Sequence, residues 1–291
     1  MRWISEDQWE RFAQEGTDAH RLGTGPGGWL DRYGEWVLWS GAGDDPRCFA
    51  GELFSRFGFA PRGCLARELA RDARDHTPAR VVDGGDPGAL TVRESGVAYR
   101  VEPAGGYSTG LFLDQRLNRR WVLGLRPART LNLFAYTGSF SVCAALGGGG
   151  TMSVDAGRRA LARARENFAL NSIDATAGHR FVAEDATKIV PRLVRRGEAF
   201  DLVVLDPPTF GRSGGRVFRI ADDLPGLVRG CFALVAPGGT LLVSCNYGPW
   251  SAADLRGLCE DALRGEAFRV APGEHPAEIP GGAISWRIAR M

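Results

Sequence analysis

The sequence predicts an α/β protein built on a doubly wound, mostly parallel sheet. Short apolar runs at Thr130–Phe134, Met152–Asp155 and Phe200–Asp206 are typical of buried strands, and the last two end in aspartate. Segments with helical spacing of apolar residues separate these runs. Parallel strands joined by right-handed helical crossovers form a sheet with helices on both faces, which is the fold class that this alternation predicts.

The chain has 291 residues, enough for a full α/β core and a smaller module. We expect an N-terminal α+β module at residues 1–104 and the α/β domain at residues 105–291. A predicted β-hairpin at Leu90–Val101, turning at Ser95 and Gly96, ends the first module. A glycine-rich cluster typical of a linker precedes that hairpin.

The composition is that of a soluble globular protein, with 44% hydrophobic and 24% charged residues. No stretch approaches ~20 apolar residues, so we expect no membrane span, and the N-terminus does not resemble a signal peptide. The cysteines are scattered without a zinc motif, which favours no metal site and reduced thiols in the cytoplasm. The net charge is only +2, and the arginine excess indicates codon bias or a use of arginine on phosphates and bases.

The N-terminal module has weaker signals. Helical spacing predicts helices over residues 3–14 and 49–57, and a Gly/Pro loop over 22–28. Alternation predicts a β-hairpin over 29–39, whose four aromatic residues either stack on RNA or, as we favour, pack against the large domain. Charges spaced i, i+4 predict a solvated helix over 65–74.

The α/β domain is expected to continue its alternation to the C-terminus. Helices are predicted at residues 115–123, 139–146, 158–167, 224–234 and 252–263. Further strands are predicted at residues 180–185, 239–245, 268–271 and 283–289. None of the histidines matches a functional position, so we expect all of them at the surface: His20, His76, His179 and His275.

The turn after the first strand is the strongest candidate for a ligand site. Gly138 stands where the chain turns from strand to helix, so its backbone can approach a ligand closely, and Ser139 could cap the helix. Asp155 follows at roughly the distance at which a βαβ unit places the carboxylate for ribose hydroxyls. Tyr136 and Thr137 replace the glycines that a diphosphate needs, which favours a nucleoside with a small charged tail. A purely structural turn, with Asp155 capping a helix, is the alternative.

Several segments together resemble a known family: residues 110–119, 131–141, 153–155, 164–171 and 206–210. They resemble class I S-adenosylmethionine-dependent methyltransferases, whose sheet is Rossmann-like. More narrowly they are similar to the branch that holds the bacterial 23S rRNA cytosine-C5 methyltransferases and a guanine-N7 rRNA methyltransferase domain. The resemblance implies S-adenosylmethionine as cofactor and RNA, most simply rRNA, as partner. Those cytosine enzymes also carry an RNA-binding PUA domain, which we do not recognise in this N-terminus.

The cofactor site is expected at the carboxyl ends of the strands. Asp155 would accept from the ribose hydroxyls, and Asp185 from the adenine amine unless Glu184 takes that role. By resemblance, Gln115 and Arg116 would help to close the site. The complete set expected to bind the cofactor is Gln115, Arg116, Asn132, Phe134, Tyr136, Thr137, Gly138, Asp155, Asp185 and Asp206.

The segment 206–210 reads Asp-Pro-Pro-Thr-Phe and is expected to meet the substrate. Pro207 and Pro208 fix the backbone and remove donors, so that rigid carbonyls face the site. Asp206 can bind a base edge or the donor's ammonium, and Phe210 can stack on a flipped base. A rigid turn that merely ends a strand is the alternative.

Cys245 distinguishes the possible reactions. Methylation of cytosine C5 needs a thiolate that adds to C6, after which C5 attacks the methyl group and loses its proton. Cys245 ends the predicted strand 239–245 and would lie beside Asp206 if the two strands are neighbours. An inert strand-end cysteine is the alternative, whereas Cys143, Cys231 and Cys259 are expected in the core.

The sequence therefore predicts a methyltransferase that uses S-adenosylmethionine and acts on a cytosine C5 of rRNA, with Cys245 and Asp206 as catalytic residues. The alternatives are guanine N7, a protein or small-molecule acceptor, or a non-catalytic RNA-binding protein. Six arginines flank the candidate site along the sequence, and some of them are expected to contact phosphate: Arg116, Arg119, Arg120, Arg212, Arg216 and Arg219.

Overall fold

The computed structural model describes residues 1–43, 45–68, 78–105, 108–213 and 216–291. Contacts divide the chain into two compact units. The first unit comprises Met1–Arg116 and Ala277–Pro280, and the second comprises Leu117–Pro276 and Gly281–Met291. The boundary expected after residue 104 falls inside the first unit.

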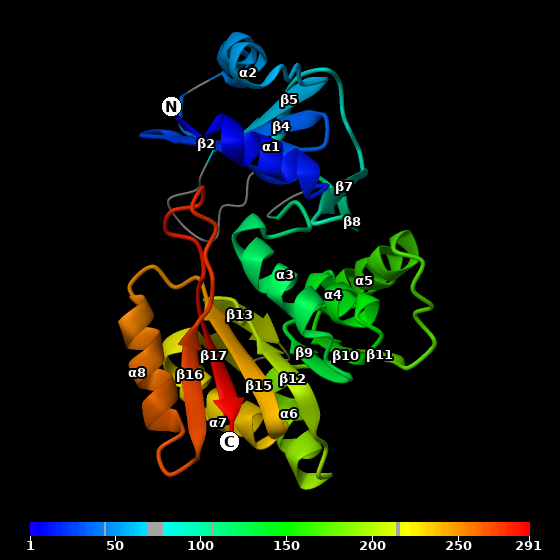
Figure 1. Ribbon diagram of the computed structural model, residues 1–291, viewed down its shortest axis with the longest axis vertical. Helices are drawn as coiled ribbons and strands as arrows, with labels where there is room; N and C mark the ends of the chain where they lie inside the picture. The colour runs from blue at the N-terminus through cyan, green and yellow to red at the C-terminus, as the bar shows by residue number, and fades with distance from the viewer. Residues whose placement is uncertain (44, 69–77, 106–107, 214–215) are drawn as a thin grey trace. The chain divides into compact units, whose positions relative to one another are not determined.

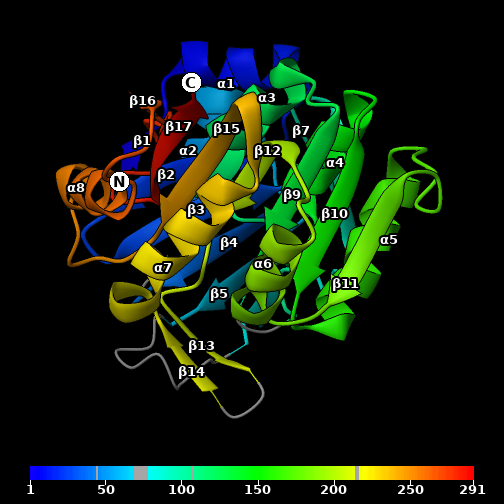
Figure 2. The ribbon, with the colours of Figure 1, turned by 90° about the horizontal axis from the view of Figure 1, so that it is seen from below.

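The second unit has the expected α/β sheet, with strands in the order β11-β10-β9-β12-β15-β17-β16 (Figures 1 and 2). Only β17 runs against the others in this order, since it pairs antiparallel with both β15 and β16. The strands are β9 Arg129–Leu133, β10 Gly150–Asp155, β11 His179–Ala183, β12 Phe200–Leu205, β15 Val235–Cys245, β16 Phe268–Pro272 and β17 Ile284–Arg290. The fold class predicted from the sequence is confirmed.

Helix α3 precedes the first strand of this sheet, and the other helices lie between its strands along the chain. They are α3 Arg116–Leu125, α4 Ser139–Leu146, α5 Arg158–Leu170, α6 Ala186–Arg195, α7 Ile220–Ala233 and α8 Ala252–Ala262, and a hairpin of β13 Phe210–Ser213 and β14 Arg216–Arg219 follows β12. Contacts join α4 and α5 to each other and to β10, and join α7 to α6 and α8. Helix α6 was not predicted because Pro191 lowers its helix propensity. Its buried Ile189, Val190 and Leu193 compensate by packing on the core.

Strand β9 is the topological switch point of the sheet. The chain leaves β9 for β10 on one side, and β12 pairs with β9 on the other. The parallel register sets Leu205 opposite both Leu133 and Val243. The carboxyl ends of β9, β12 and β15 therefore lie next to one another, which is where open α/β sheets bind ligands.

The first unit contains a second sheet in the order β1-β2-β3-β4-β5-β6 and a separate β7-β8 hairpin. Its elements are β1 Arg2–Trp3, α1 Glu6–Gln14, β2 Ala19–Gly25, β3 Gly28–Tyr33, β4 Trp36–Gly41, η1 Pro46–Phe49, α2 Ala50–Phe57, β5 Gly63–Arg67, β6 Arg80–Asp83, β7 Leu90–Glu94, β8 Val97–Val101 and η2 Leu113–Gln115. Both predicted hairpins form, and Tyr33, Trp36 and Trp39 are buried in this unit.

Two predictions for this unit are wrong. The loop expected over 22–28 is largely strand β2, because its residues pair with β3 across a buried sheet. The helix expected over 65–74 begins as strand β5, in which Leu65 and Ala66 are buried between β4 and β6. Burial in the sheet outweighs the few tenths of a kcal/mol that i, i+4 charge pairs provide. Residues 69–77 of that prediction, and His76, lie outside the described residues.

His20 is fully buried, so its expected surface position is wrong. Its ring stacks on Phe12 with centroids 4.2 Å apart, and its Nδ1 lies 3.1 Å from the Arg21 carbonyl. The pKa of His20 is lowered from 6.5 to about 3, mainly by burial. The hydrogen bond with the Arg21 backbone raises this pKa, and the charges of Arg32 and Arg116 lower it. The aromatic partners make the neutral ring tolerable in the core.

This burial predicts a pH-dependent stability. The unfolded chain binds a proton at His20 below pH 6.5 whereas the folded chain does not, so stability falls as the pH drops from 6.5 toward 3. We expect His20 to contribute a loss of about 1 kcal/mol between pH 6.5 and 5.5 in denaturant titrations, because the unfolded-state imidazole is half protonated at pH 6.5 and almost fully protonated at pH 5.5. The variant His20→Phe should lose this contribution, and His275→Phe at an exposed position should keep it. Equal slopes for wild type and His20→Phe would refute the assignment.

Candidate functional site

The turn after β9 has an unusual backbone. Phe134 and Tyr136 adopt positive φ angles of 54° and 48°, and Gly138 one of 73°. A positive φ costs a non-glycine residue of order 1–3 kcal/mol and persists only when the surroundings enforce it. The Ala135 amide donates to the Val154 carbonyl at 2.9 Å, and the Gly138 amide donates to the Ala135 carbonyl at 2.8 Å. Such strain is concentrated at ligand sites, so residues 134–138, hereafter the donor loop, are the centre of the candidate site.

Gly138 is required for packing as well as for its φ. A Cβ built on Gly138 would lie 2.8 Å from the Cβ of Ala164 on α5, closer than side chains approach. Gly138 is also the N-cap of α4, so the capping role expected for Ser139 is wrong. Helix α4 therefore begins directly at the donor loop, with its amino-terminal backbone at the carboxyl end of β9.

Asp155 ends β10 and holds the donor loop. Its Oδ2 accepts from the Tyr136 amide at 2.8 Å, and its Oδ1 accepts from the Gly157 amide at 2.7 Å. A carboxylate has about four lone-pair positions, so these contacts leave capacity for a vicinal diol. Asp155 is half-buried and is not the N-cap of α5, a position that Gly157 occupies. The remaining acceptor capacity of Asp155 fits the ribose of a nucleoside cofactor, and this ribose contact remains a prediction.

Asn132 supports the donor loop from within the core. Its Nδ2 donates to the Ser141 Oγ at 3.0 Å, and Ser141 Oγ lies 2.7 Å from Ser153 Oγ. Asn132 is 1% exposed, so it presents almost no surface to a ligand. Its role in this structure is to connect β9, α4 and β10.

Asp185 caps α6. Its Oδ1 accepts from the Thr187 amide at 2.8 Å and from the Thr187 hydroxyl at 2.7 Å. Its neighbour Glu184 forms an ion pair with Arg192. Both acids considered for the adenine amine thus already hold structural partners, and adenine recognition by Asp185 would use its second oxygen.

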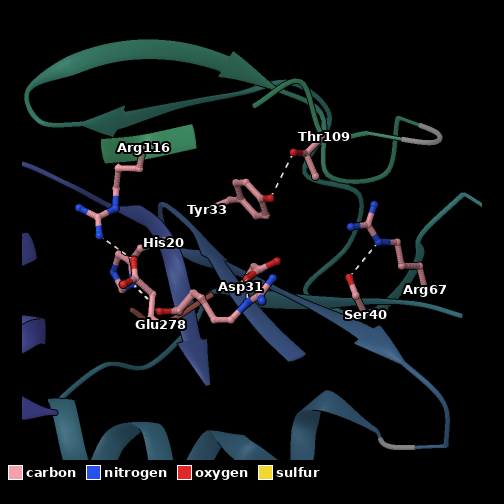
Figure 3. A network of polar contacts seen from close by, with 9 residues as sticks. His20, Asp31, Tyr33, Ser40, Arg67, Thr109, Arg116 and Glu278 are labelled. Atoms are coloured by element: carbon pink, nitrogen blue, oxygen red, sulfur yellow. Dashed lines mark hydrogen bonds and ion pairs between the residues drawn. The ribbon is translucent and has the colours of Figure 1, made fainter. Parts of the chain in front are cut away.

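Gln115 and Arg116 belong to the first unit and are buried there. Arg116 Nη2 donates to Glu278 at 2.7 Å (Figure 3). The Arg116 guanidinium also lies 4.8 Å from the centre of the Phe12 ring. Gln8 also donates to Glu278, at 3.0 Å. Arg116 thus anchors the segment Ala277–Pro280 within its unit, and its expected contact with the cofactor remains a prediction.

The Asp206–Phe210 segment leaves β12 toward the end of β15. Asp206 is half-buried, Pro207 is buried and Pro208 is exposed. Thr209 Oγ1 donates to the Asn246 carbonyl at 2.9 Å, which connects this segment to the residue after Cys245. Phe210 begins β13 opposite Arg219, and its side chain lies outside the described residues. The structure therefore brings Asp206 and Cys245 together, as the expected strand order requires.

Cys245 has no exposed surface and belongs to the hydrophobic core. Burial raises the pKa of Cys245 to about 11; a backbone hydrogen bond from Tyr247 lowers it, and the Asp206 carboxylate raises it. The thiol is therefore protonated at neutral pH in this state. Cys143, Cys231 and Cys259 are buried as predicted.

Sequence reasoning gave no role to two residues that contact the donor loop from α5, Ala164 and Asn167. Asn167 is fully buried, and its Nδ2 donates to the Thr137 carbonyl at 2.9 Å. The segment 164–171 carried a family resemblance, but the spacing of a helix does not show which loop its buried face meets. Among the described residues, no cluster of His, Cys, Asp or Glu suits a metal, and no helix there is long and apolar enough to cross a membrane.

Curated relatives are similar to more than half of this chain and to a smaller share of their own length. Ribosomal RNA large subunit methyltransferase I of Klebsiella pneumoniae is 31% identical over 84% of this chain and 62% of its own. A ribosomal RNA large subunit methyltransferase of Deinococcus radiodurans is 38% identical over 69% and 50%. Methyltransferase K/L of Hahella chejuensis is 42% identical over 54% and 22%. The chain thus spans about half the length, or less, of several of these proteins.

Solved structures share the fold. SMU.776, crystallised with S-adenosylhomocysteine, has a TM-score of 0.83 and 24% identity, covering 97% of this chain and 78% of that one. A SAM-dependent methyltransferase of Agrobacterium tumefaciens has a TM-score of 0.78 and 24% identity, covering 94% and 91%. The family model of S-adenosylmethionine-dependent methyltransferases matches residues 68–281, most of the chain. The protein therefore belongs to the S-adenosylmethionine-dependent methyltransferases and uses S-adenosylmethionine as its methyl donor.

Proposed function

We propose that the protein methylates ribosomal RNA. The observation that carries the proposal is the link between the Asp206–Phe210 segment and Asn246, at strand ends adjacent to the donor loop. An acid, rigid carbonyls and an aromatic residue at this edge suit the recognition of a base taken out of its stack. The names of the relatives, which are rRNA methyltransferases, support the same class of substrate.

The direct test is transfer of a labelled methyl group from S-adenosylmethionine to rRNA. Purified large-subunit rRNA from a strain lacking the gene should accept the label, and rRNA from the parent strain should not, because its site is already modified. Mass mapping of rRNA nucleosides from both strains identifies the modified base. Label entering a protein or small molecule, with none in rRNA, would replace the proposal with another acceptor.

Cytosine C5 is the acceptor atom that we propose first. Cys245 ends β15 beside β12 and interacts electrostatically with Asp206, an arrangement suited to addition at C6 while an acid binds the base. The thiol has no exposed surface in this state, so the reaction requires that RNA binding uncover and deprotonate it.

A nitrogen acceptor such as guanine N7 is the second candidate. It is favoured by the complete burial of Cys245 and by its raised pKa, since both oppose a thiolate nucleophile. A ring nitrogen carries its own lone pair and needs no covalent intermediate. Asp206 would then only position the base.

The arginines considered for phosphate contacts differ in their exposure to solvent. Arg116 and Arg119 are buried, which is incompatible with phosphate contact in this state. Arg120 and Arg219 are exposed, and the side chains of Arg212 and Arg216 lie outside the described residues. Arg219 follows the Asp206–Phe210 segment along the chain as the N-cap of α7, and it is the best candidate for contact with RNA.

We therefore expect RNA binding to weaken steeply with salt. Each neutralised phosphate contributes about −0.7 to the slope of log affinity against log salt for single strands. The variant Arg219→Ala should make the measured slope shallower by about that amount. Arg264→Ala, which removes an exposed arginine paired with Asp261 on α8, should leave the slope unchanged. A salt-independent interaction would count against an RNA substrate.

A further inference from the structure

Helix α5 presents two buried residues to the donor loop. Asn167 donates from its Nδ2 to the Thr137 carbonyl at 2.9 Å, and Ala164 lies in the space that a side chain on Gly138 would need. Both residues are fully buried. Their i, i+3 spacing places them on one face of the helix. A single face of α5 therefore meets two consecutive residues of the loop, Thr137 and Gly138.

The loop needs such support because its backbone is strained. Positive φ angles at Phe134 and Tyr136 persist only where neighbouring groups enforce them. The Asp155 carboxylate holds the Tyr136 amide from one side, and Asn167 holds the Thr137 carbonyl from α5. Loss of either contact would allow the backbone from Tyr136 to Gly138, which lies between the two held peptide groups, to relax toward commoner conformations.

We propose that Asn167, together with Ala164, is a positioning residue for the methyl donor. It holds the donor loop in its binding shape before the cofactor arrives, and so lowers the ordering cost of binding. Asn167 acts through Thr137 rather than by touching the donor. The proposal concerns the cofactor alone and does not depend on which acceptor the enzyme methylates.

The variant Asn167→Ala tests this role. We expect the Kd of S-adenosylhomocysteine, measured by calorimetry, to rise about tenfold, because binding must now order the loop. Amide hydrogen exchange in a peptide covering 134–142 should become faster in the free variant and return to the wild-type rate when S-adenosylhomocysteine is bound. Peptides from β12 and β15 should be unaffected, which separates local release of the loop from a general loss of stability.

Asn171→Ala is the matched control. Asn171 is the C-cap of α5, four residues after Asn167, and donates from its Nδ2 to the backbone carbonyl of Asn167 at 2.7 Å. This variant also removes one asparagine side chain from the helix, but not the bond to the donor loop. Its Kd should stay within about twofold of wild type. An equal change in both variants, or unaltered exchange of 134–142 in Asn167→Ala, would overturn the proposal.

A second pair of variants keeps the test decisive if Asn167→Ala does not fold. Gly138→Ala should weaken S-adenosylhomocysteine binding, because its Cβ would meet Ala164 at 2.8 Å. Adding Ala164→Gly removes that contact, so the double variant should recover part of the lost affinity, although the positive φ at position 138 remains unfavourable. No loss in the single variant, or no recovery in the double variant, would contradict the role of α5 as the support of the loop.

Discussion

Replacement of Asp155 by alanine should weaken S-adenosylmethionine binding by ~2 kcal/mol or more, roughly 30-fold in Kd. If Asp155 accepts from the ribose diol, its loss leaves two hydroxyl groups without partners in a partly buried site. The variant also loses the hydrogen bonds from the Tyr136 and Gly157 amides, which hold the donor loop. Calorimetric titration with S-adenosylhomocysteine measures the sum of these effects.

A cofactor analogue separates the two contributions. The 2′-deoxy form of S-adenosylhomocysteine lacks one of the two hydroxyl groups of the diol, so it should bind wild type more weakly than the natural compound does. If Asp155 binds the diol, Asp155→Ala should no longer distinguish the two compounds. A variant that still prefers the natural compound to the same extent as wild type would show that Asp155 only supports the loop.

The second unit was predictable because its strands have a strong local signal. Thr130–Phe134 and Phe200–Asp206 are apolar runs that become central strands, and α4 has the predicted bounds of residues 139–146. The parallel alternation then restricts the topology. Helix α6 escaped prediction because Pro191 lowers its intrinsic propensity, which the burial of its apolar face outweighs.

The first unit was harder to predict because its signals are weak or point to another structure. Strand β2 contains two glycines, a histidine and an arginine, and its pairing with β3 decides its structure. The solvated helix predicted from Leu65 is contradicted by the buried strand β5. His20 was misplaced because its burial depends on Phe12 and Trp9, which no local pattern connects to it.

The candidate site was predicted in outline but not in its supporting contacts. Motif and strand order were sufficient to expect Asp206 and Cys245 at neighbouring strand ends, and they lie there. The sequence left open whether Cys245 is a nucleophile or a buried strand-end cysteine, because its burial depends on a core cluster that also includes Cys259 of α8, distant along the chain. The support of the donor loop by Asn167 likewise depends on a contact between distant parts of the chain.

Replacement of Cys245 decides between the two acceptor atoms. If it is the nucleophile, Cys245→Ser should abolish methylation and leave the Kd of S-adenosylhomocysteine within about twofold, because the hydroxyl keeps the packing but does not ionise. In the free protein, the pKa of about 11 should make the Cys245 thiol resist alkylation at pH 7, whereas the exposed Cys48 thiol should react. Cys259→Ser, at another buried thiol of the same core, should retain activity.

Trapping with 5-fluorocytosine identifies the covalent step. The thiolate adds to C6, C5 displaces S-adenosylhomocysteine by taking the methyl group, and loss of the C5 proton normally allows the thiolate to leave. Fluorine at C5 cannot leave as a proton, so the protein–RNA adduct should accumulate in wild type and not in Cys245→Ser. Because the Cys245 thiol is buried in the free protein, the adduct should form only if RNA binding opens the core at the end of β15. Near-normal turnover by Cys245→Ala, with no adduct, would instead assign the methyl group to a nucleophilic nitrogen.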